Sequence, residues 1–301
     1  MSIPYLITEH TGELYALATA ITWATAVILF KKSGERVHPI GLNQFKNLLA
    51  IFLLMPTMAI MSKPILPAVA TADYLVLLVS GALGIGIADT LFFNSLNILG
   101  AGRSSIVDCL YSPFIIGLSI PWLGESLTIF QAAGAVLIVS AVLAITGEKD
   151  PGSISKEKLV TGITLGVLAM AMMAFGIVIA KPVLDRNELL WVTLVRLAGG
   201  SSVLFLYLAF HPHRMSIIYS VITAGHRTYT FTGSFIGGYI SMIIWLAGMK
   251  YTQASTASAL NQTSNIFIFI FAAMFLKERI TMVRAAAICL GVIGALLVGF
   301  G

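Results

Sequence analysis

Four ionisable residues lie inside long apolar runs of this sequence, where a charge is costly: Asp89, Asp108, Lys46 and Arg196. The other lysines and arginines stand in polar segments or at the ends of apolar runs. An ionisable group in apolar surroundings usually faces a protein interior or a water-filled cavity, and it often pairs with another charge or marks the path of a ligand or a proton. These four positions are therefore the first candidates for binding and proton transfer.

Asp89 follows the apolar run 83–88, and Phe93 and Asn97 stand four and eight residues after it. A helix brings residues at this spacing to one face, so the pattern predicts that the three side chains line the wall of a cavity. A structural role is equally open, because Asp89 could instead be an anchor that is hydrogen-bonded to a neighbouring helix or paired with a cation.

A second candidate site combines polar residues from two distant parts of the chain. One set, at helical spacing, comprises Ser104, Asp108, Tyr111 and Ser112, and the other comprises Asn261, Ser264 and Asn265, with Gln262 to one side. The two sets could meet across a cavity and bind a solute, or they could only hold helices together. The clustering of four polar groups on one face favours a cavity lining.

Lys46 and Arg196 are the cations of the candidate site. Lys46 forms a stripe with Asn43 and Asn47, and it either extends toward the helix end or pairs with Asp89 or Asp108. In the second case a substrate or a proton could compete for the carboxylate, because a nearby cation lowers the pKa of a buried carboxyl. Arg196 could bind a substrate carboxylate through two hydrogen bonds, or it could satisfy the backbone carbonyls of a broken helix.

Several aromatic residues could add an amphipathic wall to this site: Trp23, Phe93, Tyr111, Tyr239 and Trp245. For each of them alone, packing or anchoring at the membrane interface is the simpler interpretation.

The composition indicates that membrane-spanning helices position these residues. Of the 301 residues, 58% are hydrophobic and only 10% are charged, whereas soluble domains contain about 25% charged residues. The two cysteines lie in apolar runs, which excludes a disulfide scaffold. The pI of about 9.2 does not indicate a nucleic-acid partner, because the basic residues are scattered between apolar runs. The lipid bilayer is the expected surrounding.

Ten apolar runs approach the roughly 20 residues that a spanning helix needs. They lie near 14–30, 41–61, 74–97, 103–123, 127–146, 161–180, 189–210, 230–249, 254–276 and 281–300. The runs are continuously apolar, whereas the strands of a membrane barrel alternate. The expected fold is therefore an all-α integral membrane protein with ten transmembrane helices.

The two halves of the chain are similar when one is shifted along the other. A shift of 153 residues aligns 124–128 with 277–281 and Asp108 with Asn261, and near the start of each half a shift of 150 aligns Lys46 with Arg196. Because five helices per half is an odd number, the second half must enter the membrane from the opposite side. Inverted repeats of this kind are common in secondary transporters, which bind substrate at the interface between the repeats.

At this level the chain resembles the ten-helix, EamA-type branch of the drug/metabolite transporter superfamily. The resemblance rests on Trp23, the basic residues Lys46 and Arg196, the Gly-Ala-Gly-Arg turn at 100–103, Pro113, and the Glu-x-x-Thr turns at 125–128 and 278–281. It implies one repeat over 1–146, a charged linker over 147–160 and a second repeat over 161–301. Ile266 stands where Pro113 would have its counterpart, so we expect the symmetry to break around the fourth and ninth helices.

The resemblance implies a secondary transporter with alternating access that moves a small metabolite, such as an amino acid or a related amphipathic compound, and in the direction of export. Uniport and proton exchange both remain open, as do a monomer and a homodimer. The sequence contains no His-Glu-x-x-His, P-loop or Gly-x-Ser-x-Gly motif, and we expect no cofactor and no metal. The alternatives are an intramembrane enzyme or lipid scramblase that uses Asp89 and Asp108, or a membrane subunit that does not transport.

The basic residues also predict an orientation. Twelve lie in the connections after the odd-numbered helices and four in the other connections, so the positive-inside rule places both termini outside the cytoplasm. The family resemblance implies the opposite, with both termini inside. A bacterial inner membrane is the expected location.

Overall fold

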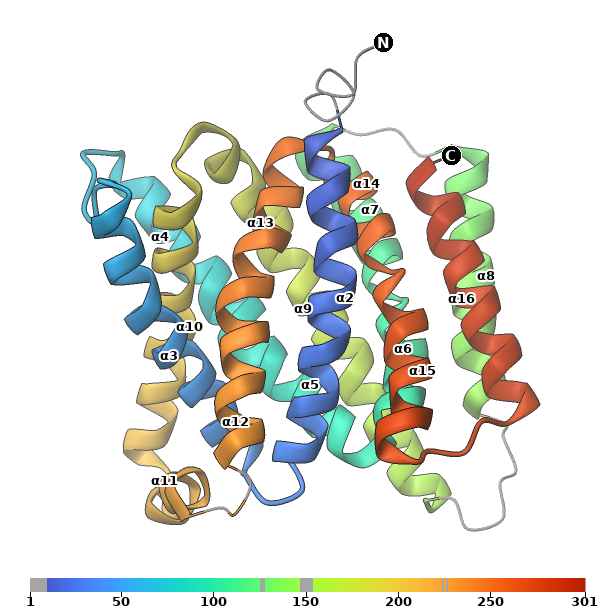
Figure 1. Ribbon diagram of the computed structural model, residues 1–301. Coiled ribbons are helices and arrows are strands. Elements are labelled where there is room, and N and C mark those ends of the chain that lie inside the picture. Colours follow the sequence, from blue (N-terminus) through green and yellow to red (C-terminus); the bar gives the residue numbers. More distant parts are fainter. Residues whose placement is uncertain (1–9, 125–127, 147–153, 224, 226, 301) are drawn as a thin grey trace.

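The computed structural model describes residues 10–124, 128–146, 154–223, 225 and 227–300, and these residues form helices joined by short connections (Figure 1). Eight helical stretches in this part of the chain are long and apolar enough to cross a membrane: Thr11–Ser33, Thr71–Leu99, Ala101–Leu123, Ile129–Thr146, Lys156–Arg186, Leu189–Phe210, Arg227–Tyr251 and Ala254–Leu276. Helices α3 (Pro39–Ile60) and α16 (Met282–Phe300) fill the two remaining positions of the expected ten. The all-α prediction is confirmed.

Several of the long stretches contain interruptions. The stretch at the third of the ten expected positions, Thr71–Leu99, consists of α4 (Thr71–Gly81), the π-helix η1 (Ala82–Ile87) and α5 (Ala88–Leu99). The stretch at the eighth position, Arg227–Tyr251, consists of α12 (Arg227–Gly233), the π-helix η2 (Ser234–Ser241) and α13 (Met242–Tyr251). The uninterrupted stretches are α2 (Thr11–Ser33), α8 (Ile129–Thr146), α9 (Lys156–Arg186) and α10 (Leu189–Phe210).

The fourth and ninth stretches are each broken in two. Helix α6 (Ala101–Asp108) is followed by α7 (Tyr111–Leu123), and α14 (Ala254–Asn261) is followed by α15 (Ser264–Leu276). The break is thus in the same place in both repeats, so the expectation of broken symmetry is wrong for the backbone. Pro113 lies in the first turn of α7, where the missing N–H of a proline costs little, so Ile266 can replace it without changing the backbone path.

The shifts found in the sequence also hold between the observed elements. A shift of 150 residues places the bounds of α3 on those of α10, and a shift of 153 places the bounds of α6 and α7 on those of α14 and α15. The same shift carries Gly124, with φ of 71°, to Lys277, with φ of 56°, and each ends its helix in the left-handed conformation. The two halves therefore have the same local design.

Two elements differ from the expected runs. Helix α9 has 31 residues and extends beyond the predicted 161–180 at both ends, and the side chain of Ser155 caps its start. The segment 211–229, expected to be a connection, contains α11 (Arg214–Thr223) and the start of α12. Hydropathy misses such parts because they are polar or short enough to lie at the edge of the membrane.

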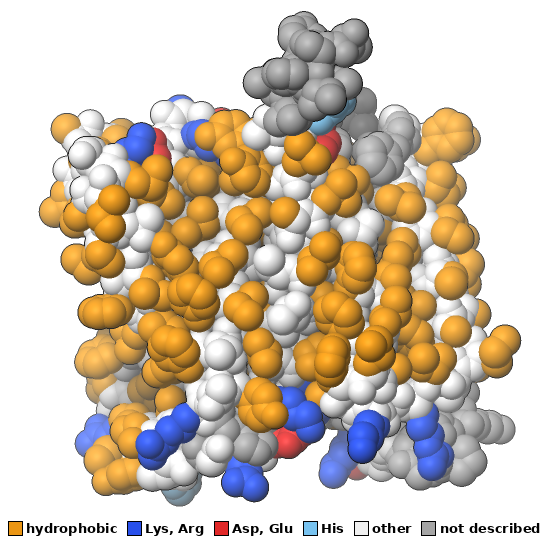
Figure 2. All heavy atoms as spheres, in the orientation of Figure 1, with side chains coloured by type: hydrophobic (Ala, Val, Ile, Leu, Met, Phe, Trp, Pro, Cys, Tyr) orange, Lys and Arg blue, Asp and Glu red, His pale blue; other side chains and the backbone are white. Residues whose placement is uncertain are grey.

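The packing interleaves the two halves. Helices α4 and η1 of the first half contact α10 of the second, α3 contacts η2, and α2 contacts α13, α14 and α15. Helices α8 and α16 pack on each other at one edge of the bundle (Figure 1). The space-filling view shows apolar side chains over the sides, with Lys and Arg gathered near the ends and more of them at the end that carries α11 (Figure 2).

Candidate functional site

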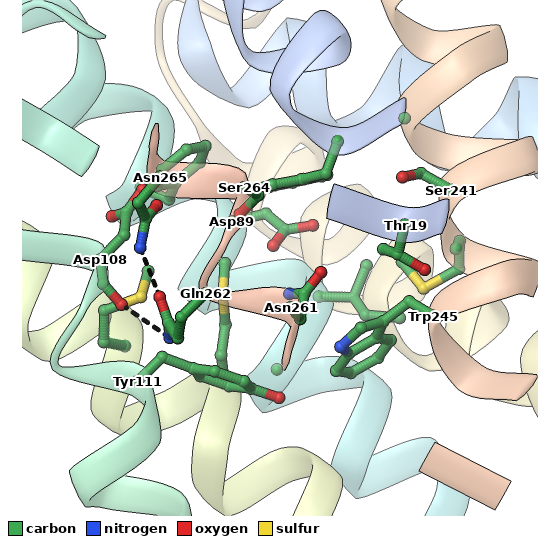
Figure 3. A pocket seen from close by; sticks show the side chains of 18 of the residues that line it. Thr19, Asp89, Asp108, Tyr111, Ser241, Trp245, Asn261, Gln262, Ser264 and Asn265 are labelled. Atoms are coloured by element: carbon green, nitrogen blue, oxygen red, sulfur yellow. Dashed lines mark hydrogen bonds between the residues drawn. The ribbon is translucent and has the colours of Figure 1, made fainter. Parts of the chain in front are cut away.

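A cavity lies where the halves meet. Its walls come from α2, from η1 and α5, from both broken stretches, from α9 and α10, and from η2 and α13 (Figure 3). Eight of the twelve sequence-predicted site residues line it: Trp23, Asp89, Asp108, Tyr111, Arg196, Trp245, Asn261 and Asn265. Ligand sites at the interface of inverted repeats and at broken helices are typical of secondary transporters.

Four predicted site residues do not line the cavity. Phe93 is turned toward Phe30, at 4.9 Å between ring centroids, and its neighbour Phe92 faces the cavity instead. Asn97 is two helical turns beyond Asp89, near the end of α5, where its backbone carbonyl accepts a hydrogen bond from Lys31 Nζ at 2.9 Å. Spacing along a helix fixes a face but not how far the cavity extends along it.

Tyr239 is the third residue outside the cavity. Its hydroxyl is hydrogen-bonded to Thr57 Oγ1 of α3 at 2.6 Å. Tyr239 belongs to the π-helix η2, which turns its residues by a different angle from an α-helix. Gly237 and Ser241 of the same segment face the cavity instead.

Lys46, the fourth, lies directly behind the cavity wall, where its ammonium group is hydrogen-bonded to Asp89 Oδ2. Both residues are buried, at 1% and 5% exposure, and Lys46 Nζ lies 5.5 Å from the centre of the Phe93 ring. Of the two pairings open at the sequence level, the structure has Lys46 with Asp89 and not with Asp108. The charge of Asp89 is therefore neutralised within the first half of the chain.

Arg196 has no such partner. Its Nε–H donates to Ser80 Oγ at 2.8 Å, and that hydroxyl donates to the carbonyl of Gly176 at 2.6 Å. The guanidinium lies over the Trp245 ring at 5.6 Å, and its buried Nη1 has no hydrogen-bond partner. The 153-residue shift places Met242 where the first half has Asp89. Within the described residues, no carboxylate forms an ion pair with Arg196, and its charge faces the cavity.

Asp108 is the carboxyl group of the cavity that likewise lacks an ion-pair partner among the described residues. It ends α6 at the break, it is 7% exposed, and its Oδ1 has no hydrogen-bond partner. Its backbone carbonyl accepts a hydrogen bond from Gln262 Nε2 at 3.2 Å (Figure 3). Among the described residues Asp108 forms no ion pair. The cavity therefore presents a guanidinium group and a carboxyl group that form no ion pair among the described residues.

Further polar atoms at the two breaks face the cavity without partners. The hydroxyl of Tyr111 and Oδ1 of Asn261 are buried and make no hydrogen bond. Asn265 donates through Nδ2 to Gln262 Oε1, and the same group lies 3.3 Å from Cys109 Sγ. Buried polar groups without partners are costly, and a bound polar solute would satisfy them.

Several lining residues had no distinctive sequence pattern. Thr19, Phe92, Met170, Met173 and Met242 are lining residues that were not predicted. The spacing of Thr19 and Trp23, and of Met170 and Met173, places each pair on one helical face. That signal is present in the sequence but is the same for any buried face. These methionines and aromatic rings give the cavity an apolar wall.

Comparison with known proteins identifies relatives over nearly the whole chain. The model of the EamA-like transporter family matches residues 10–147 and 160–300. An uncharacterized transporter of Archaeoglobus fulgidus is 26% identical over 285 residues, which cover 94% of this chain and 96% of that protein. The uncharacterized transporter YvbV of Bacillus subtilis is 28% identical over 221 residues, which cover 69% and 68%. A solved crystal structure with 18% identity has the same fold, with a TM-score of 0.72 over 96% of both chains.

Proposed function

The chain belongs to the EamA-like transporter family of multi-pass membrane transporters, and we propose that its central cavity carries a small bipolar metabolite. The transported solute has an anionic group that binds Arg196 and a cationic group that binds Asp108. A neutral amino acid or a related amphipathic compound has this charge pattern.

The observation that carries this proposal is that two of the four buried ionisable residues form an ion pair and the other two do not. Lys46 and Asp89 neutralise each other, whereas Arg196 and Asp108 line the cavity without ion pairs among the described residues. Burying an unpaired charge is expensive, so a solute that supplies both missing charges is stabilised relative to one that supplies neither. The rings of Trp23 and Trp245 provide an apolar surface for the rest of the solute.

Alternating access follows from the duplicated, inverted halves. The cavity lies between the broken stretches α6–α7 and α14–α15. Rocking one half against the other about this fixed site would expose it first to one side of the membrane and then to the other. The direction of net transport is export, and the membrane is the bacterial inner membrane, as the family resemblance implies.

The basic end of the bundle is the cytoplasmic end in this proposal. The excess of Lys and Arg in the connections after the odd-numbered helices supports this orientation. A C-terminal reporter that is active only in the cytoplasm tests it, and a strong signal from that reporter would overturn it.

Proteoliposomes provide the test of the proposed function. A metabolite pool is offered to vesicles that contain the wild type, Arg196→Gln, Asp108→Asn or, as a control, Lys156→Gln at the exposed start of α9. We expect the wild type and the control to take up one or more zwitterionic compounds and both site variants to lose at least nine-tenths of this uptake. Equal uptake by all four proteins would contradict the assignment of the site.

A pH gradient across the same vesicles separates the two energy sources. If protons are exchanged, the gradient accelerates uptake in the wild type, and Asp89→Asn or Asp108→Asn abolishes this acceleration. Flux that is indifferent to the gradient in all proteins identifies uniport.

A further inference from the structure

The connection between α10 and α12 carries a short helix with an apolar outer face. In α11, Met215, Ile218, Tyr219 and Ile222 are 57%, 42%, 55% and 55% exposed. Their spacing places them in one stripe along the helix. Figure 1 shows α11 at the end of the bundle, crossing the direction of the spanning helices. The stripe therefore lies at the level of the membrane surface.

The opposite face of α11 fixes the helix to the bundle. Ile217 is only 3% exposed and packs with Ile40 of α3 and Leu204 of α10. Ser220 Oγ accepts a hydrogen bond from the backbone N–H of His38 at 3.0 Å. Helix α11 is therefore packed in a fixed position between the α2–α3 connection and the end of α10, with the apolar stripe on its outer face.

Three exposed arginines lie on α11 or on the segments beside it, and Arg214 Nη1 donates a hydrogen bond to the carbonyl of Ala209 at 2.7 Å. Arg214 begins α11, Arg227 begins α12, and Arg36 belongs to the α2–α3 connection. The Arg36 guanidinium lies across Gly225, because a Cβ added to that glycine would be 2.8 Å from Arg36 Nη1. Arg36 thus lies beside the turn that leads to Arg227. None of the three forms an ion pair among the described residues, and Glu35 is paired with Lys32 at 3.2 Å.

We infer that α11 and these three arginines form a docking surface for the headgroups of anionic phospholipids. The apolar stripe of a helix that lies in the membrane plane enters the boundary between headgroups and acyl chains. Arginines beside it would then meet lipid phosphates, which they bind with paired hydrogen bonds. An anionic lipid is favoured over a zwitterionic one because each surface arginine adds attraction to a negative headgroup. This inference is independent of the transported solute.

Fluorescence quenching by brominated lipids tests the surface directly. Ile222→Trp places a reporter on the stripe, and the signal of the parent protein is subtracted. Vesicles contain phosphatidylcholine with increasing fractions of either brominated phosphatidylglycerol or brominated phosphatidylcholine. We expect half-maximal quenching at a severalfold lower fraction of the brominated anionic lipid.

Three further variants are made in the Ile222→Trp protein. Arg36→Gln/Arg227→Gln raises the fraction of anionic lipid for half-quenching by about fivefold or more, since each arginine near the surface contributes roughly that factor. Arg36→Lys/Arg227→Lys retains the charges and most of the preference. Lys156→Gln/Lys158→Gln removes two exposed charges from α9 and leaves the preference unchanged.

Three results would overturn the inference. Equal quenching by both lipids would show that headgroup charge is not recognised. An equal loss of the preference for anionic lipid in Arg36→Gln/Arg227→Gln and in Lys156→Gln/Lys158→Gln would show only an effect of general surface charge. A reporter that neither lipid quenches would show that another protein surface covers α11. Arg36→Lys/Arg227→Lys is the folding control. If it elutes in gel filtration like the parent protein and keeps the preference for anionic lipid, a loss in Arg36→Gln/Arg227→Gln is a loss of binding and not misfolding.

Discussion

At the scale of single residues, the protein treats its buried charges in two ways. Lys46, behind the cavity wall, forms an ion pair with the lining residue Asp89, whereas Arg196 and Asp108 line the cavity without ion pairs among the described residues and are the proposed ligand-binding groups. Paired charges hold structure, and unpaired charges at a cavity recognise solutes. The two pairs of positions should therefore respond differently to substitution.

Removing one member of the Lys46–Asp89 ion pair should destabilise the protein. Lys46→Met leaves Asp89 as an uncompensated buried charge, with an expected cost of about 3–5 kcal/mol. The double variant Lys46→Met/Asp89→Asn removes both charges and should recover most of this loss. Unfolding midpoints in detergent measure both effects, and a double variant that is no more stable than Lys46→Met would show that the pair is not the reason.

The sequence patterns identified the charged residues of the candidate site correctly, but they predicted less well which neighbouring side chains face the cavity. Ionisable residues in apolar runs identified all four charges, because burial of a charge is unusual enough to be informative. Phe93 and Asn97 were misplaced because helical spacing does not tell how far the cavity extends along a face, and Tyr239 was misplaced because it lies in a π-helix. A π-helical turn before Asp89 and another at Tyr239 also change the facing without a clear sequence signal.

At the scale of elements, the π-helix η1 depends on a side chain from α3. Asn43 Nδ2 donates to the carbonyls of Ile85 and Gly86, each at 2.9 Å. In contrast, Asn47 is one turn further along α3 and its side-chain oxygen and nitrogen have no partners. Both asparagines are 0% exposed, so they are a matched pair.

Asn43→Leu should lower the free energy of unfolding by about 1–3 kcal/mol, because it removes the amide donor from the Ile85 and Gly86 carbonyls, of which Gly86 keeps a hydrogen bond from Thr90 Oγ1 at 2.7 Å. Asn47→Leu should be neutral or stabilising, since it replaces a buried amide that makes no hydrogen bond. Chemical unfolding in detergent compares the two variants. The account of η1 fails if the Asn47 substitution costs as much as the Asn43 substitution.

Helices α8 and α16 approach each other through glycine. A Cβ added at Gly134 would lie 2.4 Å from the carbonyl oxygen of Gly294, a backbone atom that cannot rotate away. Gly134→Ala should therefore separate the two helices and cost about 1–3 kcal/mol. Gly117→Ala on α7, where nothing lies within 4 Å of the added atom, is the control and should be neutral or slightly stabilising. Thermal midpoints measure the difference, and equal midpoints would contradict the close packing.

At the scale of the whole molecule, most of the architecture was predictable. Continuous apolar runs gave the spanning helices, and the shifts of 150 and 153 residues correspond to equivalent elements in the two halves. The breaks at 109–110 and 262–263 were not predicted, because the polar residues beside them were interpreted as the lining of a cavity and not as the ends of helices. Helix α11 was missed because its ten residues are too few to resemble a span.

The two helix breaks position the polar residues of the cavity. Each interrupts a spanning stretch at the cavity, and they bring Asp108 of one half and Asn261 of the other to its lining. The same backbone design thus carries a carboxylate in one half and an amide in the other. In the proposed binding mode, this chemical difference between similar halves would distinguish the two ends of a bound solute.

The most direct test of this account is competition for transport by a series of related solutes. One zwitterionic substrate from the uptake screen is compared with its carboxamide and with its deaminated acid, in the wild type, Arg196→Gln and Asp108→Asn. Each lost charged hydrogen bond should weaken competition in the wild type by about tenfold or more. Arg196→Gln should no longer distinguish the substrate from its carboxamide, and Asp108→Asn should no longer distinguish it from the deaminated acid. If both variants retain the wild-type order of competition, the solute is not bound between these two charges.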